Sequence, residues 1–178
     1  MGRTEQGVEK SLHRYQVIPR VLCFVLDGDR VLLLRGAATK RIWPNKYNGL
    51  GGHVERGEDI YTAALREIHE ESGVEVTNLR LRGVVTIDAG HPVGIVLFIF
   101  LADAVTTEAR PSNEGTLEWV PLDALATYDV VEDIRVVLPQ VLRADREAQV
   151  FCAHYQYDAA DNLLIVWPAR AETAHGRA

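Results

Sequence analysis

The chain of 178 residues has few cysteines and no long apolar run. Its two cysteines, Cys23 and Cys152, lie far apart and do not form a pair with zinc-ligand spacing, so we expect two reduced thiols. The longest apolar run, VGIVLFIFLADA, is too short to cross a bilayer, and residues 1–14 lack the apolar core of a signal peptide. We therefore expect a cytoplasmic protein with no disulfide and no membrane partner.

The chain also lacks an excess of basic residues. Its 25 acidic and 19 basic side chains give a formal charge of -6. A surface that follows the phosphates of a polynucleotide requires clustered positive charge, so we expect no polynucleotide partner. The composition fits better with a small anionic ligand whose charge is balanced by a metal ion.

No pair of histidines has the spacing of a zinc site. Three histidines lie near segments of interest, namely His53, His69 and His91. We expect their imidazoles to face solvent or a hydrogen-bond partner and not a metal.

The apolar pattern mixes strands and helices without regular alternation. Predicted strands lie near residues 17–26, 30–35, 79–87, 94–105, 117–121, 149–158 and 162–168, and predicted helices span 59–72 and 131–144. The segment between the second strand and the first helix lacks a period and is predicted to be a loop. Since no repeat or linker divides the chain, we expect one α+β domain over residues 15–168, with mobile segments at 1–14 and 169–178.

The helix predicted at 59–72 carries an unusual concentration of carboxylates. Glu67, Glu70 and Glu71 fall within an arc of roughly 100°, beside an apolar stripe that includes Leu65 and Ile68. Like charges at this spacing destabilise a helix by roughly 0.2 to 0.5 kcal/mol per pair, so a positive partner is expected. Carboxylate oxygens suit Mg²⁺. For the hexapeptide REIHEE alone, a solvated acidic face is the competing interpretation.

Glycines surround this helix. Gly51 and Gly52 permit close backbone approach before it, Gly57 permits the turn into it, and Gly73 lies just past its end. The loop and the helix therefore look like one constructed unit.

The spacing of these residues resembles a known family. Gly52, Glu58 after five intervening residues, and the run REIHEESGV at 66–74 after seven more match every fixed position of the Nudix hydrolase box. The resemblance implies the Nudix fold, an α/β/α sandwich around a mixed sheet. It also implies cleavage of a diphosphate linked to another moiety, usually a nucleoside, with Mg²⁺ or Mn²⁺ and a water nucleophile.

The resemblance assigns roles to residues of the box. It implies metal ligands at the side chains of Glu67, Glu70 and Glu71 and at the carbonyl of Gly51. Arg66 and Glu58 would hold loop and helix together and orient Glu67. The proton acceptor is left open between Glu71 and Glu114, because a downstream segment of the family carries an acidic residue before a tryptophan.

Glu114 has a rival in the same stretch, SNEGTLEWVPLDAL. Glu118 lies closer to the tryptophan, and an exposed loop carboxylate without a role is the competing interpretation for either residue.

Outside the box, the sequence resembles the oxidised purine nucleoside triphosphate hydrolases, of which 8-oxo-dGTP diphosphatase is typical. The resemblance implies base recognition by Asn48, for which a turn-forming role is the alternative, and by Asp133, for which Glu132 could substitute. Val131 stands where a stacking aromatic is expected. Trp43 could stack on the base from the other side or plug the loop.

The expected activity is magnesium-dependent release of pyrophosphate and a nucleoside monophosphate from a nucleoside triphosphate, by a monomer or homodimer. The alternative is hydrolysis of ADP-ribose or another nucleoside diphosphate derivative, although Pro92 falls slightly late for the proline associated with ADP-ribose hydrolases. A catalytically silent nucleotide-binding regulator is a third interpretation. The complete set of box carboxylates argues against it.

Overall fold

The computed structural model of the protein describes residues 14–110 and 114–168. The terminal segments predicted to be mobile lie outside these ranges, apart from Arg14. Within the described ranges, no helix is both long enough and apolar enough to cross a membrane.

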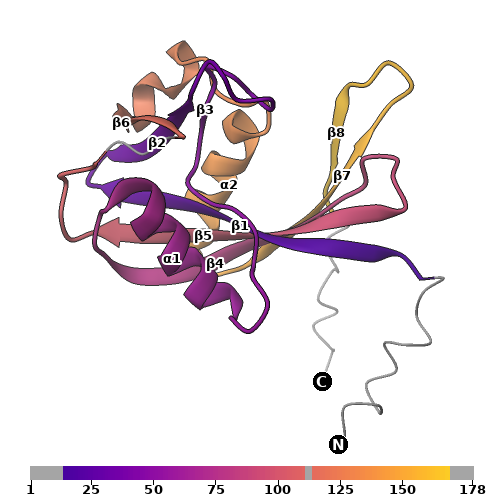
Figure 1. Cartoon of the computed structure of the whole chain (residues 1–178), viewed down its shortest axis with the longest axis horizontal. Coiled ribbons are helices and arrows are strands. Elements are labelled where there is room, and N and C mark those ends of the chain that lie inside the picture. The colour runs from indigo at the N-terminus through magenta and orange to yellow at the C-terminus, as the bar shows by residue number, and fades with distance from the viewer. Residues whose placement is uncertain (1–13, 111–113, 169–178) are drawn as a thin grey trace, which may run out of the picture.

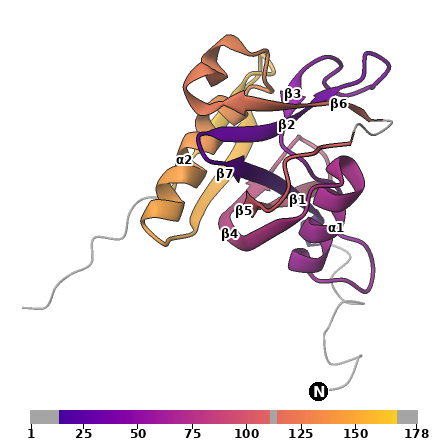
Figure 2. The ribbon, with the colours of Figure 1, turned by 90° about the vertical axis from the view of Figure 1, so that its left-hand side faces the viewer.

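A mixed β-sheet with a helix on each side forms the body of the protein (Figure 1 and Figure 2). The strands are β1 (Gln16–Asp27), β2 (Arg30–Gly36), β3 (Tyr47–Asn48), β4 (Val76–Ile87), β5 (Val93–Ala104), β6 (Gly115–Pro121), β7 (Phe151–Tyr157) and β8 (Leu163–Val166). The helices are α1 (Ile60–Ser72), α2 (Ile134–Arg146) and the short 3₁₀ helix η3 (Leu122–Thr127). This arrangement confirms the expected α+β class and sandwich.

The sheet is built around two long parallel strands. Its order is β3-β2-β1-β5-β4-β7-β8, and β6 pairs with β2 off this path. β1 and β5 pair in parallel from Gln16 with Val93 to Leu26 with Asp103, and β4 and β7 are also parallel. The remaining strand pairs are antiparallel. The β7–β8 hairpin extends beyond the layer of the two helices (Figure 1).

Side chains of β1 alternate between two cores, because successive residues of a strand point to opposite faces. Leu22 and Phe24 belong to the core beneath α2. Val21, Cys23 and Val25 belong to the core beneath α1. The sheet thus separates two environments, and β1 takes part in both.

The ends of α1 lie where the sequence predicted them. The Asp59 carboxylate accepts hydrogen bonds from the N–H groups of Tyr61 and Thr62, at 2.8 and 3.1 Å. Gly73 ends the helix with a left-handed φ of 67°, and its N–H donates to the His69 carbonyl at 2.8 Å. One expectation for this helix is wrong. Leu65 is 47% exposed, since it lies to one side of the stripe that contacts the sheet.

Two local expectations also require correction. β3 lies within the predicted loop. Its two residues pair with β2, Asn48 with Leu34 and Tyr47 with Arg35. A two-residue strand has no period that a sequence pattern could reveal. α2 begins at Ile134 instead of residue 131, because the Val131 N–H donates to the Tyr47 carbonyl at 2.9 Å and fixes the preceding loop in a non-helical path.

Gly73→Ala tests the ending of α1. A Cβ at this position would lie 3.5 Å from the nearest atom of Arg110, so only the left-handed backbone opposes the change. We expect a loss of about 1 kcal/mol in the free energy of unfolding, measured by urea denaturation, and a smaller loss for Gly73→Asn. Equal stability of wild type and Gly73→Ala would contradict the assigned helix end.

Candidate active site

Arg66 is the centre of an ion-pair network at the acidic edge of α1. Its Nη2 and Nε lie 2.8 and 3.2 Å from the two carboxylate oxygens of Glu58. Its Nη1 donates to Glu67 at 2.9 Å and to Glu70 at 3.0 Å, and Nη2 also donates to the carbonyl of His53 at 3.0 Å. The predicted link between Arg66, Glu58 and Glu67 is therefore present, and it includes Glu70 as well.

The glycine loop before α1 packs against β1 at very short range. The Gly52 carbonyl accepts a hydrogen bond from the Val21 N–H at 2.9 Å. A Cβ on Gly52 would lie 2.4 Å from a carboxylate oxygen of Glu67. Gly51 has a φ of 148°, and a Cβ there would lie 2.1 Å from the Val21 carbonyl oxygen. Side chains at these two positions would thus push the loop away from the helix or from β1.

Glu71 is a buried carboxyl on the side of α1 that faces this loop. It is 6% exposed, and one of its oxygens accepts a hydrogen bond from the Gly51 N–H at 2.8 Å. Burial and the charges of Glu114 and Glu67 raise the pKa of Glu71 to about 8, although the Gly51 hydrogen bond acts in the opposite direction. The site therefore holds more negative charge than its own residues balance.

Glu114 approaches Glu71 from the segment that leads into β6. The Lys40 ammonium lies 2.6 Å from a carboxylate oxygen of Glu114 and lowers the pKa of that carboxyl. Glu114 also hydrogen-bonds to Glu71. The structure therefore brings Glu114 to the acidic helix as expected. Lys40 was not anticipated, because it lies in a loop without a period or a motif.

Glu118, the rival of Glu114, is held elsewhere. Its two carboxylate oxygens accept hydrogen bonds from the hydroxyls of Tyr47 and Tyr128, at 2.6 and 2.9 Å. The rings of these two tyrosines meet edge to face, with centroids 5.2 Å apart. This is a cross-link between β3, β6 and the segment after η3.

The residues predicted to recognise the base lie in three separate segments, namely Trp43 in the loop after β2, Asn48 at the end of β3 and Asp133 before α2. The Asn48 amide oxygen accepts a hydrogen bond from the Gly49 N–H at 2.8 Å, which is the turn-forming contact named as its alternative. Asp133 lies at the start of α2, and burial raises the pKa of its carboxyl. Glu132 is exposed, and Trp43 is 49% exposed, so the tryptophan does not plug its loop.

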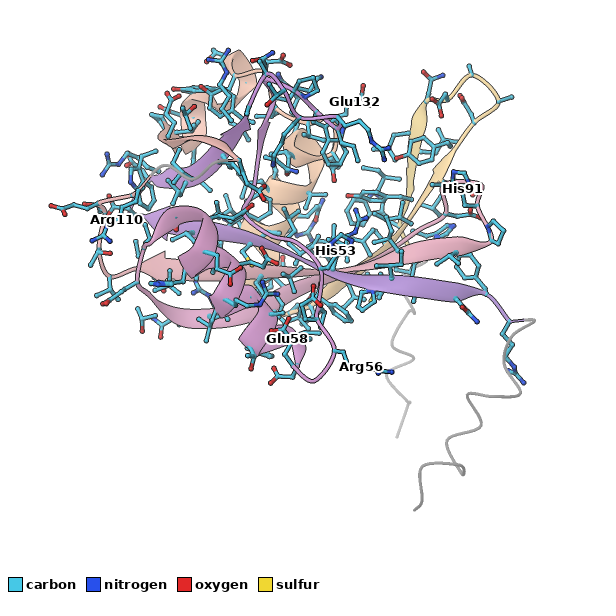
Figure 3. All side chains as sticks on the ribbon, in the orientation of Figure 1. His53, Arg56, Glu58, His91, Arg110 and Glu132 are labelled. Carbon is cyan, nitrogen blue, oxygen red and sulfur yellow. The ribbon has the colours of Figure 1, made fainter. Side chains whose placement is uncertain are left out.

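The structure describes both cysteines and the three histidines named above. Cys23 is buried, Cys152 is exposed, and both are free thiols. His53, His69 and His91 are exposed. Figure 3 places His53 near Glu58, whereas His91 lies in the distant turn between β4 and β5.

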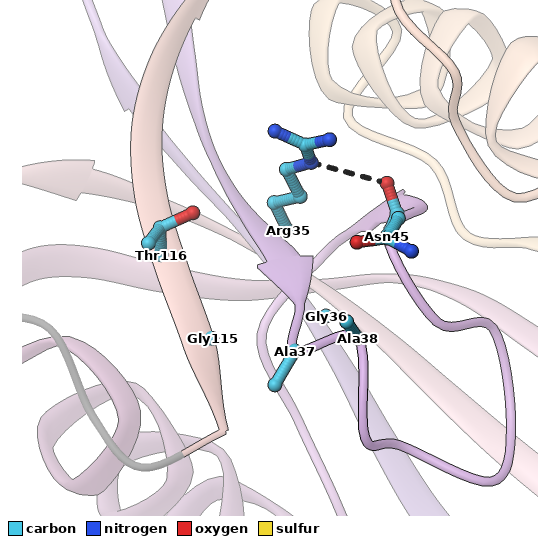
Figure 4. Close-up of a pocket in the computed structure, with 7 residues that line it drawn as sticks. All are labelled: Arg35, Gly36, Ala37, Ala38, Asn45, Gly115 and Thr116. Carbon is cyan, nitrogen blue, oxygen red and sulfur yellow. Dashed lines mark hydrogen bonds between the residues drawn. The ribbon is translucent and has the colours of Figure 1, made fainter.

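A cavity of about 390 Å³ lies at the start of β6. Its wall is formed by the end of β2, the loop after it and the start of β6, as Figure 4 shows, and comprises Arg35, Gly36, Ala37, Ala38, Asn45, Gly115 and Thr116. The Nε of Arg35 donates to the Asn45 carbonyl at 3.3 Å. Gly115 follows Glu114 in the chain, but the residues that line the cavity include neither Glu114 nor Glu71.

The carboxylates have the chemistry of a hard-cation site but are not gathered around one point. In residues 14–110 and 114–168, no three acidic, histidine or cysteine side chains converge to form a closed metal site. Arg66 binds Glu67 and Glu70, while Glu71 turns toward Gly51. Their carboxylate and carbonyl oxygens are nevertheless the ligands that Mg²⁺ and Mn²⁺ take in proteins, and burial together with the neighbouring carboxylates raises the pKa of Glu71.

A family model described as a NUDIX domain matches residues 17–141 of the chain. The chain belongs to the Nudix family. Among curated proteins, it is 33% identical over 144 residues to the oxidized purine nucleoside triphosphate hydrolase of Mus musculus, covering 80% of this chain and 88% of the mouse protein. It is 35% identical to the NAD-capped RNA hydrolase NudC of Pseudomonas aeruginosa, covering 69% of this chain and 43% of that protein.

Solved structures agree with this assignment. A MutT protein from Bacillus halodurans superposes with a TM-score of 0.69 at 28% identity, covering 83% of this chain and 95% of the other. The protein is thus a Nudix hydrolase that acts on diphosphate bonds, and its sheet with two flanking helices is the Nudix fold.

Gly52→Ala tests the close contact between loop and helix. The added Cβ would collide with the Glu67 carboxylate, so we expect a roughly ten- to hundred-fold loss of Mn²⁺ affinity, measured by calorimetry, with the fold retained. Gly90→Ala is the control for a loss of stability alone: its φ of 73° opposes an alanine as at Gly73, but nothing lies within 4 Å of its Cβ, so its Mn²⁺ affinity should stay at the wild-type value. Unchanged affinity in Gly52→Ala would contradict the assigned geometry.

Glu71 should also make stability depend on pH in the absence of metal. The pKa of Glu71 is raised in the folded protein from an ordinary 4.5 to about 8, so the folded state keeps a proton that the unfolded state releases. The stability from this proton is complete below about pH 4.5 and is lost as the pH rises toward about 8. Urea unfolding in EDTA should show this decline for wild type and a weaker decline for Glu71→Gln. Parallel curves for the two proteins would exclude Glu71 as the source.

Proposed function

We propose that the protein is a magnesium-dependent pyrophosphohydrolase that cleaves a purine nucleoside triphosphate to a nucleoside monophosphate and pyrophosphate. The observation that carries the proposal is the complete acidic edge of α1, held against the glycine loop by Arg66, with Glu114 beside Glu71. The similarity to a mouse hydrolase of oxidized purine nucleoside triphosphates, which extends over 80% of this chain, supports the substrate class.

The oxygens that would hold the cation are those of Glu67, Glu70 and Glu71 and the Gly51 carbonyl. A bound Mg²⁺ supplies charge neutralisation at the diphosphate oxygens and lowers the pKa of a coordinated water. Arg66 acts as a positioning residue, because its contacts fix the directions of the Glu67 and Glu70 carboxylates.

The proton acceptor in this proposal lies within the pair formed by Glu71 and Glu114. These two carboxyls share a hydrogen bond, and burial gives Glu71 the greater affinity for a proton. Lys40 stabilises the ionised form of Glu114 from the other side. A proton taken from water can therefore be held by the pair without placing two adjacent charges in a buried site.

Base recognition is assigned to Asn48, Asp133 and Trp43. They offer an amide, a buried carboxyl and a half-exposed indole. An amide presents both a donor and an acceptor, and an indole offers a stacking surface. The proposal includes a preference for an oxidised purine, because the similar mouse protein is an oxidized purine nucleoside triphosphate hydrolase.

Hydrolysis of another nucleoside diphosphate derivative is the second candidate. The observation that favours it is the 35% identity to the NAD-capped RNA hydrolase of Pseudomonas aeruginosa, although the chain covers only 43% of that protein. ADP-ribose belongs to the same chemical class. Both candidates use the same acidic helix and differ in what is attached to the diphosphate.

A substrate panel separates these candidates. The protein is incubated with Mg²⁺ and purine and pyrimidine nucleoside triphosphates, 8-oxo-dGTP, ADP-ribose and NAD, and released pyrophosphate is separated from phosphate and monophosphates. We expect pyrophosphate from at least one purine nucleoside triphosphate. Turnover of only ADP-ribose or NAD would favour the second candidate, hydrolysis of a nucleoside diphosphate derivative. Turnover of no substrate would reject both candidates.

Glu71→Gln and Glu114→Gln test the acidic pair on the best substrate of the panel. We expect kcat to fall by roughly 100-fold or more for the variant that removes the proton acceptor, since general-base catalysis contributes about 10² to 10⁴. Glu75→Gln, an exposed site after α1, is the control with the same chemical change. Full activity in both pair variants would contradict the proposal.

A further inference from the structure

On the side of α2, part of the face of the sheet is not covered by the helix; this apolar surface is called the floor below. β5 lies in the interior of the sheet, yet only part of its face is covered. Ile99 and Leu101 are fully buried in the core beneath α2, whereas Ile95 and Leu97 remain partly exposed toward the start of the strand. Beyond the start of α2, an apolar surface therefore lies open between β1 and β7.

Arg20 borders this floor on the β1 side. β1 pairs with β5 without a register shift, so Arg20 points to the same face as Leu22 and Phe24 and lies beside Leu97. Its Nε is buried and has no hydrogen-bond partner. Among the residues that the structure describes, Arg20 also forms no ion pair, unlike Arg66, Arg80 and Arg82.

Tyr155 borders the floor on the opposite side. Its buried hydroxyl hydrogen-bonds to the Asp133 carboxyl, and burial together with the charge of Asp133 raises the pKa of the phenol. Tyr155 pairs with Ile87 in β4, Ile87 with Ile95, and Ile95 with Ile18 in β1. Arg20 and the Tyr155–Asp133 pair are therefore on one face of the sheet.

The distance between them suits a ligand. Three strand spacings separate β1 from β7, which amounts to roughly 14 Å between backbones before the side chains reach inward. An apolar lining with a few placed polar groups is the usual composition of a small-molecule site, and it suits a planar heterocycle with polar edges. A buried donor without a partner is costly unless a ligand or water satisfies it.

We propose that Arg20 is a specificity-determining residue that donates hydrogen bonds to the carbonyl oxygen at position 6 of a purine, so that the site prefers guanine-type over adenine-type nucleotides. The inference rests on the proposed function and specifies which purine base the substrate carries. A guanidinium only donates hydrogen bonds. The carbonyl of guanine accepts them, whereas the amino group of adenine at the same position is itself a donor.

The sheet argues for a base and against a phosphate as the partner of Arg20. The carboxylates assigned to the metal lie on α1, which packs against the other face through Val21 and Cys23. The floor beside Arg20 is apolar, formed by Ile18, Ile95 and Leu97. A planar ring covers such a surface while its edge meets Arg20, whereas a phosphate bound to Arg20 would lose hydration against the apolar side chains and leave them uncovered.

Binding of monophosphates tests the inference independently of catalysis. Guanosine and adenosine monophosphate are titrated by calorimetry into wild type, Arg20→Leu, Arg20→Lys and, as a control, Arg14→Leu, an exposed site before β1. We expect wild type and Arg14→Leu to prefer guanosine monophosphate. Arg20→Leu should lose at least tenfold of that preference, and Arg20→Lys should lose part of it, because lysine keeps the charge without the planar fork.

Other outcomes overturn the inference. Equal preference for guanine in wild type and Arg20→Leu would show that Arg20 does not contact the base. Equal weakening of both nucleotides would assign Arg20 to the phosphate, and an absence of guanine preference in wild type would reject the named base. The melting temperature of Arg20→Leu should not fall, since the change removes a polar atom without a partner.

Steady-state kinetics of the intact enzyme separates a failure of this inference from a failure of the proposed pyrophosphohydrolase activity. With guanine and adenine nucleoside triphosphates, Arg20→Leu should raise KM for the guanine substrate at least tenfold and change kcat little. If wild type releases pyrophosphate from neither substrate, the proposed function fails, while the monophosphate titration still decides the role of Arg20.

Discussion

The site depends on one guanidinium. Arg66 binds Glu58, Glu67 and Glu70 together with the carbonyl of His53, and so joins the acidic edge of α1 to the loop before it. Without this charge, neighbouring carboxylates on successive turns would repel one another. With it, the loop comes close enough that only glycine fits at position 52. The geometry of a metal-binding helix is thus set by a cation that belongs to the protein.

The same arrangement leaves part of the negative charge unbalanced. Arg66 reaches Glu67 and Glu70 but not Glu71, which lies buried beside Glu114 with a pKa raised to about 8. A proton stabilises this pair when no other cation is present. A divalent ion would replace that proton, which links metal binding, pH and protein stability through a single buried carboxyl.

Much of the acidic helix and its loop could be predicted from the sequence, because residues close together in the chain form them. The apolar period and the flanking residues located the helix and its ends at Asp59 and Gly73, and the resemblance to the Nudix box implied the contact of Arg66 with Glu58. Long-range contacts between loops could not be predicted. The pairing of Lys40 with Glu114 joins residues 74 positions apart, and the buried Arg20 Nε without a hydrogen-bond partner appears only when the strands and helices are assembled.

The central claim is that a divalent cation binds at the acidic edge of α1 against the glycine loop. The most direct test is paramagnetic broadening of amide resonances in ¹⁵N-labelled protein as Mn²⁺ is added in substoichiometric amounts. The account predicts early loss of the signals of Gly51, Gly52 and the second half of α1, and their retention in Glu67→Gln. Broadening that begins at other carboxylates, such as Asp103 and Asp145 around Arg80, would contradict it.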